Sequence, residues 1–188
     1  MRAIFGSMVA ISMLAAPLRA TETLPPMVGI SASAAKERAE LFADLATAKN
    51  DIEARAIEDR LWAFWRSFAD ERSRELLEAS RKAQLEFDYA HALIALQELV
   101  KHQPDFAEGW NQYGYVLFLA GDYDAALQAI DRVLTLEPMH YAALAGKGII
   151  LTQQGKAAEA QAPLKRALAI NPWLKERNLI GKNPVPLP

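Results

Sequence analysis

A spacing of 34 residues relates two stretches in the second half of this chain. Gly114 and Gly148 stand 34 positions apart (148 − 114), and other residues keep the same spacing. These further pairs are Gly121 with Gly155, Ala126 with Ala160, Leu134 with Leu168, and Pro138 with Pro172. A fixed period of this size is typical of repeat proteins, in which each repeat is one supersecondary unit. Because one unit cannot bury its apolar face alone, the units are expected to stack on one another.

Each unit is predicted to be a pair of helices. From Ser31 to about Leu179 the chain is rich in Ala, Leu, Glu, Lys and Arg and has almost no strand signal. Gly121 and Gly155 are expected to end helices in the left-handed conformation, and prolines end the helices that follow. The expected helix pairs are 73–86 with 89–102, 107–120 with 123–136, and 141–154 with 157–170, preceded by 33–47 and 51–69 and followed by a short piece at 173–180.

Short polar side chains are expected to cap several of these helices. Asn50 with Glu53 resembles a capping box, and Asp105 with Glu108 repeats the pattern. Asp122 is placed to cap the helix that follows it.

A unit of two helices and 34 residues resembles the tetratricopeptide repeat (TPR) family. In 107–140 the family's positions are occupied by Trp110, Tyr113, Gly114, Leu117, Ala126, Ile130 and Pro138. In 141–174 they are occupied by Leu144, Gly148, Leu151, Ala160, Leu164, Ala167 and Pro172. The preceding unit keeps Tyr89, Ala92, Leu96 and Pro104 but has Ser80 where glycine is expected.

The resemblance implies an all-α fold, a right-handed α-solenoid of TPR helix-turn-helix repeats with an N-terminal helix pair and a short C-terminal capping helix. The expected division is a signal peptide at 1–20, an extended leader at 21–30, an N-terminal helical pair resembling a degenerate repeat at 31–72, a degenerate first TPR at 73–106, a second TPR at 107–140, a third at 141–174, and a C-terminal cap with a Pro-rich tail at 175–188.

The repeated glycines are expected to mark a close approach of two helices. Glycine inside a helix costs about 1 kcal/mol relative to alanine, so Gly114 and Gly148 need a packing reason. Small residues at 114 and 126, and at 148 and 160, would let the two helices of a unit approach closely. A larger side chain there would overpack the contact by roughly 1–3 kcal/mol.

The first 20 residues have the pattern of a secretory signal. Arg2 is followed by a short apolar run and by small residues near Ala20. The apolar run is shorter than the roughly 20 residues that a membrane helix needs, and the alternative is an uncleaved anchor. The sequence therefore predicts cleavage after Ala20 and an exported, periplasmic protein.

Composition argues against several function classes. The chain has no cysteine, which excludes disulfides, thiolate metal sites and a cysteine nucleophile. The formal net charge is −2 and no basic block is present, so nucleic-acid binding is not expected. His91, His102 and His140 are not spaced as metal ligands, and no phosphate loop or hydrolase motif occurs. We therefore expect no catalytic, cofactor or metal site, and no enzyme activity.

An aromatic stretch at 61–68, "LWAFWRSF", is expected to form the core of the N-terminal helix pair and to pack on the first repeat. The alternative is that Trp62, off the main stripe, is partly exposed for a partner. The residues expected to cover the last repeat are Trp173, Leu174, Leu179 and Ile180.

A second apolar stripe on 107–120 predicts a binding groove, because one stripe is enough to pack the helix. In the proteins that this chain resembles, the matching positions line a concave surface that binds a protein partner, here a peptide or a helix. The predicted groove residues are Leu77, Arg81, Gln84, Asn111, Tyr115, Phe118, Leu119 and Ile149. The alternative is a structural or oligomerisation unit whose groove is filled by its own "TETLPPMVGI" or "GKNPVPLP", or is covered by helix 51–69. Capture of a C-terminal carboxylate is not predicted.

Overall fold

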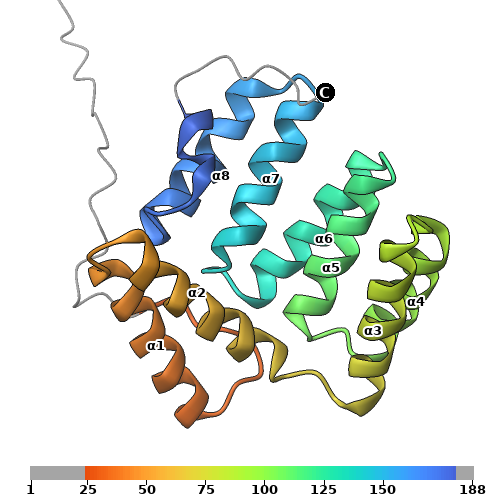
Figure 1. Cartoon of the computed structure of the whole chain (residues 1–188), viewed down its shortest axis with the longest axis horizontal. Coiled ribbons are helices and arrows are strands. Elements are labelled where there is room, and N and C mark those ends of the chain that lie inside the picture. Colours follow the sequence, from red (N-terminus) through yellow and green to blue (C-terminus); the bar gives the residue numbers. More distant parts are fainter. Residues whose placement is uncertain (1–23, 181–188) are drawn as a thin grey trace, which may run out of the picture.

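The computed structural model describes residues 24–180, so the predicted signal at 1–20 and the tail at 181–188 lie outside the described residues. Within that range the chain forms α-helices, one 3-10 helix and no strand, which confirms the predicted all-α class (Figure 1). The elements are α1 (Ala32–Thr47), α2 (Asp51–Arg66), α3 (Glu71–Leu85), α4 (Tyr89–His102), α5 (Ala107–Leu119), α6 (Tyr123–Leu136), α7 (Tyr141–Gln153), α8 (Ala157–Ile170) and η1 (Lys175–Leu179).

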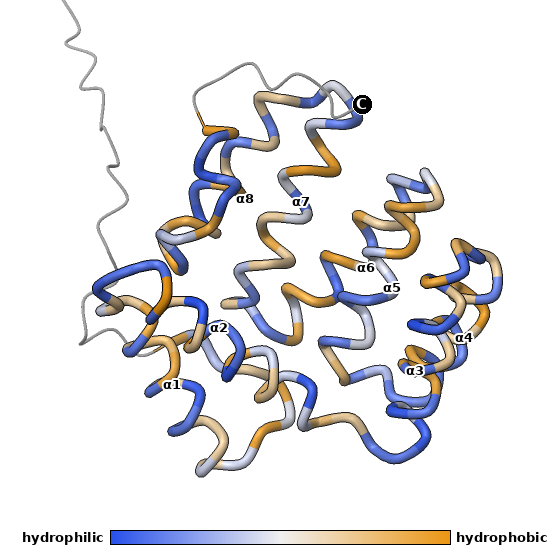
Figure 2. The backbone as a smooth tube through the Cα atoms, viewed as in Figure 1, coloured by the Kyte–Doolittle hydropathy of each residue, from blue (hydrophilic) through white to orange (hydrophobic). Residues whose placement is uncertain are grey.

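Three helix pairs stand side by side in chain order. Figure 1 shows α3–α4, α5–α6 and α7–α8 as successive antiparallel pairs, and α5 contacts both α3 and α7. Hydrophilic and hydrophobic residues alternate along these helices, as amphipathic packing requires (Figure 2). The array is a solenoid in which α3, α5 and α7 are consecutive neighbours.

The turn inside each unit needs a left-handed residue. Gly121 and Gly155 have φ of +82° and +76°, which confirms the expected helix ends. The equivalent residue of the first unit is Phe87, with φ of +56° and its side chain 79% exposed. A non-glycine residue in this region carries backbone strain. The first unit is thus degenerate at its turn as well as at Ser80.

Two of the three predicted caps form. The side chain of Asn50 accepts a hydrogen bond from the Glu53 amide at 2.9 Å, and Asp122 accepts one from the Ala125 amide at 3.1 Å.

The predicted cap at Asp105 is wrong. The residue before α5 is Phe106, which gives no side-chain cap. Glu108, expected to complete that capping box, is buried, and its carboxylate accepts hydrogen bonds from Asn111 and Gln112 instead.

The glycine contacts confirm the expected close approach of the two helices in a unit. A Cβ at Gly148 would overlap Leu164, and one at Gly114 would lie 3.1 Å from Cδ1 of Ile130. The facing residues of α6 and α8 are therefore one turn beyond Ala126 and Ala160, the small residues that the repeat pattern indicated.

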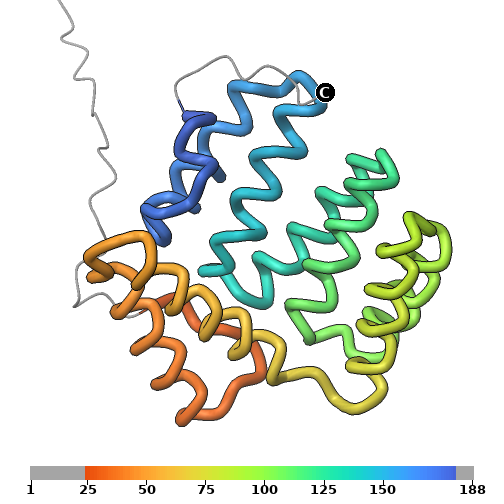
Figure 3. Tube along the Cα trace, in the orientation of Figure 1, coloured from red at the N-terminus to blue at the C-terminus, as the bar shows by residue number. Residues whose placement is uncertain are grey.

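The N-terminal helix pair packs mainly on the third unit, whereas the sequence predicted packing on the first; Phe68 of the aromatic stretch packs against the buried clusters of both. Leu41, Phe42, Leu61 and Trp65 share one buried cluster with residues of α7 and α8. The members from the third unit are Tyr141, Leu144, Ala145, Ala167 and Ile170, and Met139 precedes that unit. Figure 3 shows the trace of α1–α2 beside the C-terminal end of the array. Trp65 of the aromatic stretch contacts Tyr141 at the start of α7, with 5.5 Å between the ring centroids.

Three residues related by the 34-residue repeat hold this N-terminal pair in place. Gln103, Glu137 and Asn171 each follow the last turn of the second helix of a unit. Gln103 donates to the Phe68 carbonyl at 2.8 Å, and Asn171 donates to the Glu58 carboxylate. The same position in each repeat thus contacts a different part of the segment 38–73.

The middle contact of the three is a buried ion pair. Arg38 of α1 donates to both carboxylate oxygens of Glu137, at 2.6 and 2.5 Å, and both side chains are almost fully buried. The Met139 amide and the Trp65 indole also donate to this carboxylate, at 2.8 and 3.4 Å. A negative charge at a helix C-terminus is unfavourable, so the guanidinium of Arg38 offsets both the helix dipole and the burial.

Candidate functional site

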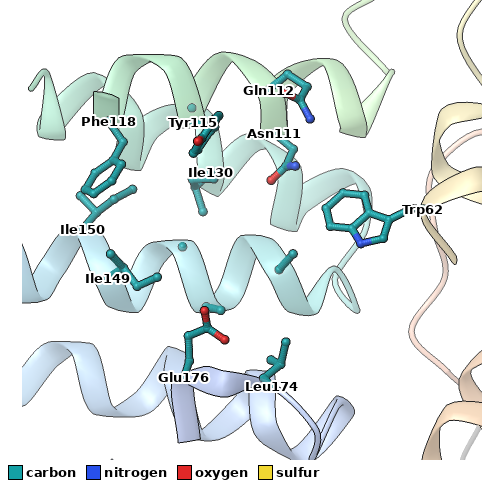
Figure 4. A pocket seen from close by; sticks show the side chains of 14 residues that line it. Trp62, Asn111, Gln112, Tyr115, Phe118, Ile130, Ile149, Ile150, Leu174 and Glu176 are labelled. Atoms are coloured by element: carbon teal, nitrogen blue, oxygen red, sulfur yellow. The ribbon is translucent and has the colours of Figure 1, made fainter. Parts of the chain in front are cut away.

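Some side chains of α5 pack in the interior, and others face an open groove. Trp110 and Tyr113 pack against the buried clusters of the first two units. Asn111, Tyr115 and Phe118 lie on another face of α5, where they line a pocket of about 380 Å³. Tyr115 is 50% exposed, which is unusual for a large aromatic side chain. The second apolar stripe of α5 therefore faces a groove (Figure 4).

Five different elements line this groove, and α6 contributes Ile130. α7 contributes Ile149 and the small residues Ala145 and Gly146. Trp62 of α2 stands at one end, and Leu174, which leads into η1, closes the side opposite α5 (Figure 4). The lining is mostly apolar with a few polar groups, the usual character of a ligand or peptide site.

Half of the predicted groove residues line the pocket. Asn111, Tyr115, Phe118 and Ile149 are brought together there by α5 and α7. The pocket does not include Leu77, Arg81, Gln84 or Leu119.

The predicted residues of α3 have other neighbours. Leu77 packs against the buried cluster of the first unit. Arg81 makes an exposed ion pair with Glu78, and Gln84 donates to the Ser80 hydroxyl at 3.1 Å. Among the three units, only the second and third contribute to the pocket, although the same helical spacing continues into the first.

Trp62 is the groove residue for which the sequence left two alternatives open. Its side chain is half-buried, with its ring edge-on to Trp65 at 5.4 Å and to His140 at 5.7 Å between ring centroids. Phe64 and Trp65 are buried, as the core interpretation predicts, while Trp62 also lines the pocket. The position of Trp62 off the main apolar stripe was the sequence signal for this exposure.

A buried polar pair lies behind the Trp62 end of the groove. The imidazole of His140 is stacked on Trp65 at 4.0 Å, and its Nδ1 accepts a hydrogen bond from the Ala143 amide. Its Nε2 is buried without a hydrogen-bond partner among the described residues and lies 3.4 Å from the carboxylate of Glu108. Both side chains are almost fully buried.

Tyr141 is a second buried polar group at this junction. Its hydroxyl is buried without a hydrogen-bond partner among the described residues. Burial raises the pKa of the Tyr141 phenol, and the carboxylates of Glu58 and Asp59 raise it further. Glu58 and Asp59 of α2 therefore lie close to the third unit.

The charge in the lining of the groove is negative. Among the described residues that line it, Glu176 is the only charged one, and it makes no ion pair or hydrogen bond within residues 24–180. No group of His, Asp and Glu in the described range is arranged to hold a metal ion. No described helix has the length and apolarity that crossing a membrane requires.

Residues 24–30, the described part of the leader, do not occupy the groove. Met27 is buried against the N-terminal helix pair, and the Val28 amide donates to the Leu136 carbonyl at 2.9 Å. None of residues 24–30 lines the pocket. The other segment suggested as an internal occupant, "GKNPVPLP", lies outside the described residues.

The stacked helix pairs and the groove on their first helices define the class: an all-α repeat scaffold. The tetratricopeptide repeat model matches residues 76–138 and 120–172, more than half of the chain. The chain belongs to the tetratricopeptide repeat family.

Known proteins with sequence or structural similarity carry the same repeat. A TPR repeat-containing protein of Rhizobium etli is 29% identical over 143 residues, which are 76% of this chain and 70% of that protein. Tetratricopeptide repeat protein 36 of Xenopus tropicalis is 30% identical over 107 residues, 55% of this chain and 53% of that protein. The TPR2B domain of yeast Sti1, solved as a complex with pHsp70, has a TM-score of 0.54 at 18% identity and covers 58% of this chain and 91% of its own.

Proposed function

We propose that this chain is a non-catalytic TPR module that binds a peptide or helix of a partner protein in the groove between α5 and α7. Asn111, Tyr115, Phe118 and Ile149 would form its centre. A longer partner segment would continue along α3 toward Leu77, Arg81 and Gln84, passing Leu119. No cofactor and no nucleic acid are part of this proposal.

The observation that carries the proposal is the exposed aromatic surface of α5. Tyr115 is half-exposed beside a mostly apolar pocket that no described segment of the chain fills. Aromatic side chains in such positions supply a large share of the binding energy in protein interfaces. The yeast Sti1 domain with the same fold, recorded in complex with pHsp70, supports a protein partner.

The test removes the two aromatic anchors together. Tyr115→Ala with Phe118→Ala is expected to abolish capture of partners from an extract of the native host, while circular dichroism shows an unchanged helix content. Ile52→Ala is the matched control, because Ile52 is 82% exposed on α2 and does not line the groove. If the folded double variant retains every partner at wild-type affinity, the groove is not the binding site.

We also propose that the protein is exported and acts in the periplasm. The proposal rests on the cationic start, the short apolar run and the small residues of 1–20. N-terminal sequencing of the protein from its native host should begin near Thr21. Recovery of the soluble cytoplasmic protein with Met1 intact would contradict export.

A further inference from the structure

The groove offers hydrogen-bond acceptors and a negative charge but no cation. Glu176 points from η1 toward the groove (Figure 4), and no Lys, Arg or His of the described chain lines the pocket. Lys175 and Arg177, its neighbours in sequence, are exposed and are not part of the lining. A partner carboxylate would therefore meet a like charge with no cation to offset it.

A buried carboxylate fixes the orientation of two amide side chains that line the groove. Asn111 Nδ2 and Gln112 Nε2 donate to Glu108, at 3.1 and 2.6 Å. Because both amino groups are used in this way, the amide oxygens of Asn111 and Gln112 remain as acceptors without a donor in the described structure. Figure 4 shows the oxygen of Asn111 on the groove side. This part of the groove therefore suits a group that donates hydrogen bonds.

The apolar part of the groove also suits a Lys or Arg side chain, which donates hydrogen bonds. Trp62, Tyr115 and Phe118 line the pocket from α2 and α5. Aromatic faces attract Lys and Arg side chains, and they also pack the methylene stems that carry the charge. Apolar residues on either side of such a cation would contact Ile149 and Leu174.

From these observations we infer that the groove selects a partner segment in which a lysine or arginine is flanked by apolar residues. The cation faces Glu176 and the amide oxygens of Asn111 and Gln112, and its stem lies against Tyr115 and Phe118. The apolar neighbours contact Ile149 and Leu174. This inference rests on the proposed function, and it adds the chemistry of the partner to it.

The test selects ligands without assuming a sequence. A random twelve-residue peptide library, acetylated and amidated, is displayed to the full chain and to Tyr115→Ala with Phe118→Ala. Peptides that bind the wild-type chain but not the double variant depend on the groove. They are expected to be enriched in Lys and Arg at one position between apolar residues, and a Glu176→Lys variant is expected to change that enrichment to Asp and Glu.

Each outcome separates this inference from the proposed function. Groove-dependent peptides without basic enrichment would overturn the inference and leave the binding function standing. Absence of any groove-dependent peptide, from the full chain and from a chain ending at Ile180, would overturn both. If only the shortened chain selects basic peptides, residues 181–188 with their own Lys182 are the occupant, and the assignment to an external partner is wrong.

Affinity measurement gives a second readout on the best selected peptide. Glu176→Gln is expected to weaken its binding about threefold to fivefold, the usual range for one partly exposed ion pair. Glu86→Gln removes an exposed acid from the turn between α3 and α4, outside the groove, and should leave binding unchanged. Equal affinities for wild type and Glu176→Gln would count against the inference.

Discussion

At the scale of single residues, Gly146 and Gly148 lie two positions apart on α7 and have opposite roles. A Cβ at Gly148 would overlap Leu164, whereas a Cβ at Gly146 would meet no atom within 4 Å. The repeat pattern predicted the first role, because Gly148 recurs 34 positions after Gly114. The repeat pattern carried no information on Gly146, which lines the groove between α5 and η1.

Alanine substitutions separate these two glycines. Gly146→Ala should raise the free energy of unfolding by up to about 1 kcal/mol, because alanine is the better helix former. Gly148→Ala gains the same propensity but overpacks Leu164, at roughly 1–3 kcal/mol, so a net loss of stability is expected. Urea denaturation followed by circular dichroism measures both, and equal midpoints for the two variants would refute the assignment of Gly148 to the inner contact.

At the scale of helices, the sequence predicts the boundaries well and the placement of α1–α2 poorly. Caps, left-handed glycines and prolines are local signals, so they define the helix ends of the three units to within a few residues. The predicted helix 51–69 ends at Arg66 instead, and the chain then turns before the Asp70 cap of α3. The packing of α1–α2 on the third unit joins apolar residues that are distant in sequence and includes polar residues such as Glu137, which no helical periodicity distinguishes from surface residues.

The Arg38–Glu137 pair offers a test of how α1 is attached. Arg38→Met leaves the carboxylate of Glu137 buried without its cation, and removal of one partner of a buried pair costs about 3–5 kcal/mol. Adding Glu137→Gln removes the uncompensated charge while an acceptor for the Met139 amide remains, so the double variant should be more stable than Arg38→Met alone. A thermodynamic cycle from urea denaturation checks this, and additive losses would show that the two side chains are not coupled.

At the scale of the whole molecule, the groove combines a repeated part and a part outside the repeats. Asn111, Tyr115 and Ile149 follow from the spacing of the first helices, and the sequence indicated them. Glu176 comes from η1 after the last repeat, Leu174 is the last residue before η1, and Trp62 comes from a helix before the first repeat. The sequence predicted that Leu174 covers the last repeat, but it did not indicate that α2 packs on the third unit and brings Trp62 to the same groove.

The attachment of α1–α2 also changes how the repeats are coupled. In a simple solenoid each unit contacts only its neighbours, and a perturbation fades along the array. Here Gln103, Glu137 and Asn171 connect the segment 38–73 to the ends of all three units. A change in the last unit should therefore reach α2, which precedes the first unit in the sequence.

Hydrogen exchange tests this coupling with Asn171→Ala. The substitution removes the hydrogen bond to Glu58 and the acceptor of the Trp173 amide. A lost hydrogen bond is worth about 1 kcal/mol, so amides of α2 should exchange about fivefold faster while those of α3 and α4 keep their rates. Gln154→Ala is the control, since Gln154 donates to Asp124 within the array and does not reach α2. If exchange increases only in α7 and α8 of Asn171→Ala, the N-terminal pair is held by apolar burial alone, and the repeat-equivalent contacts do not couple it to the array.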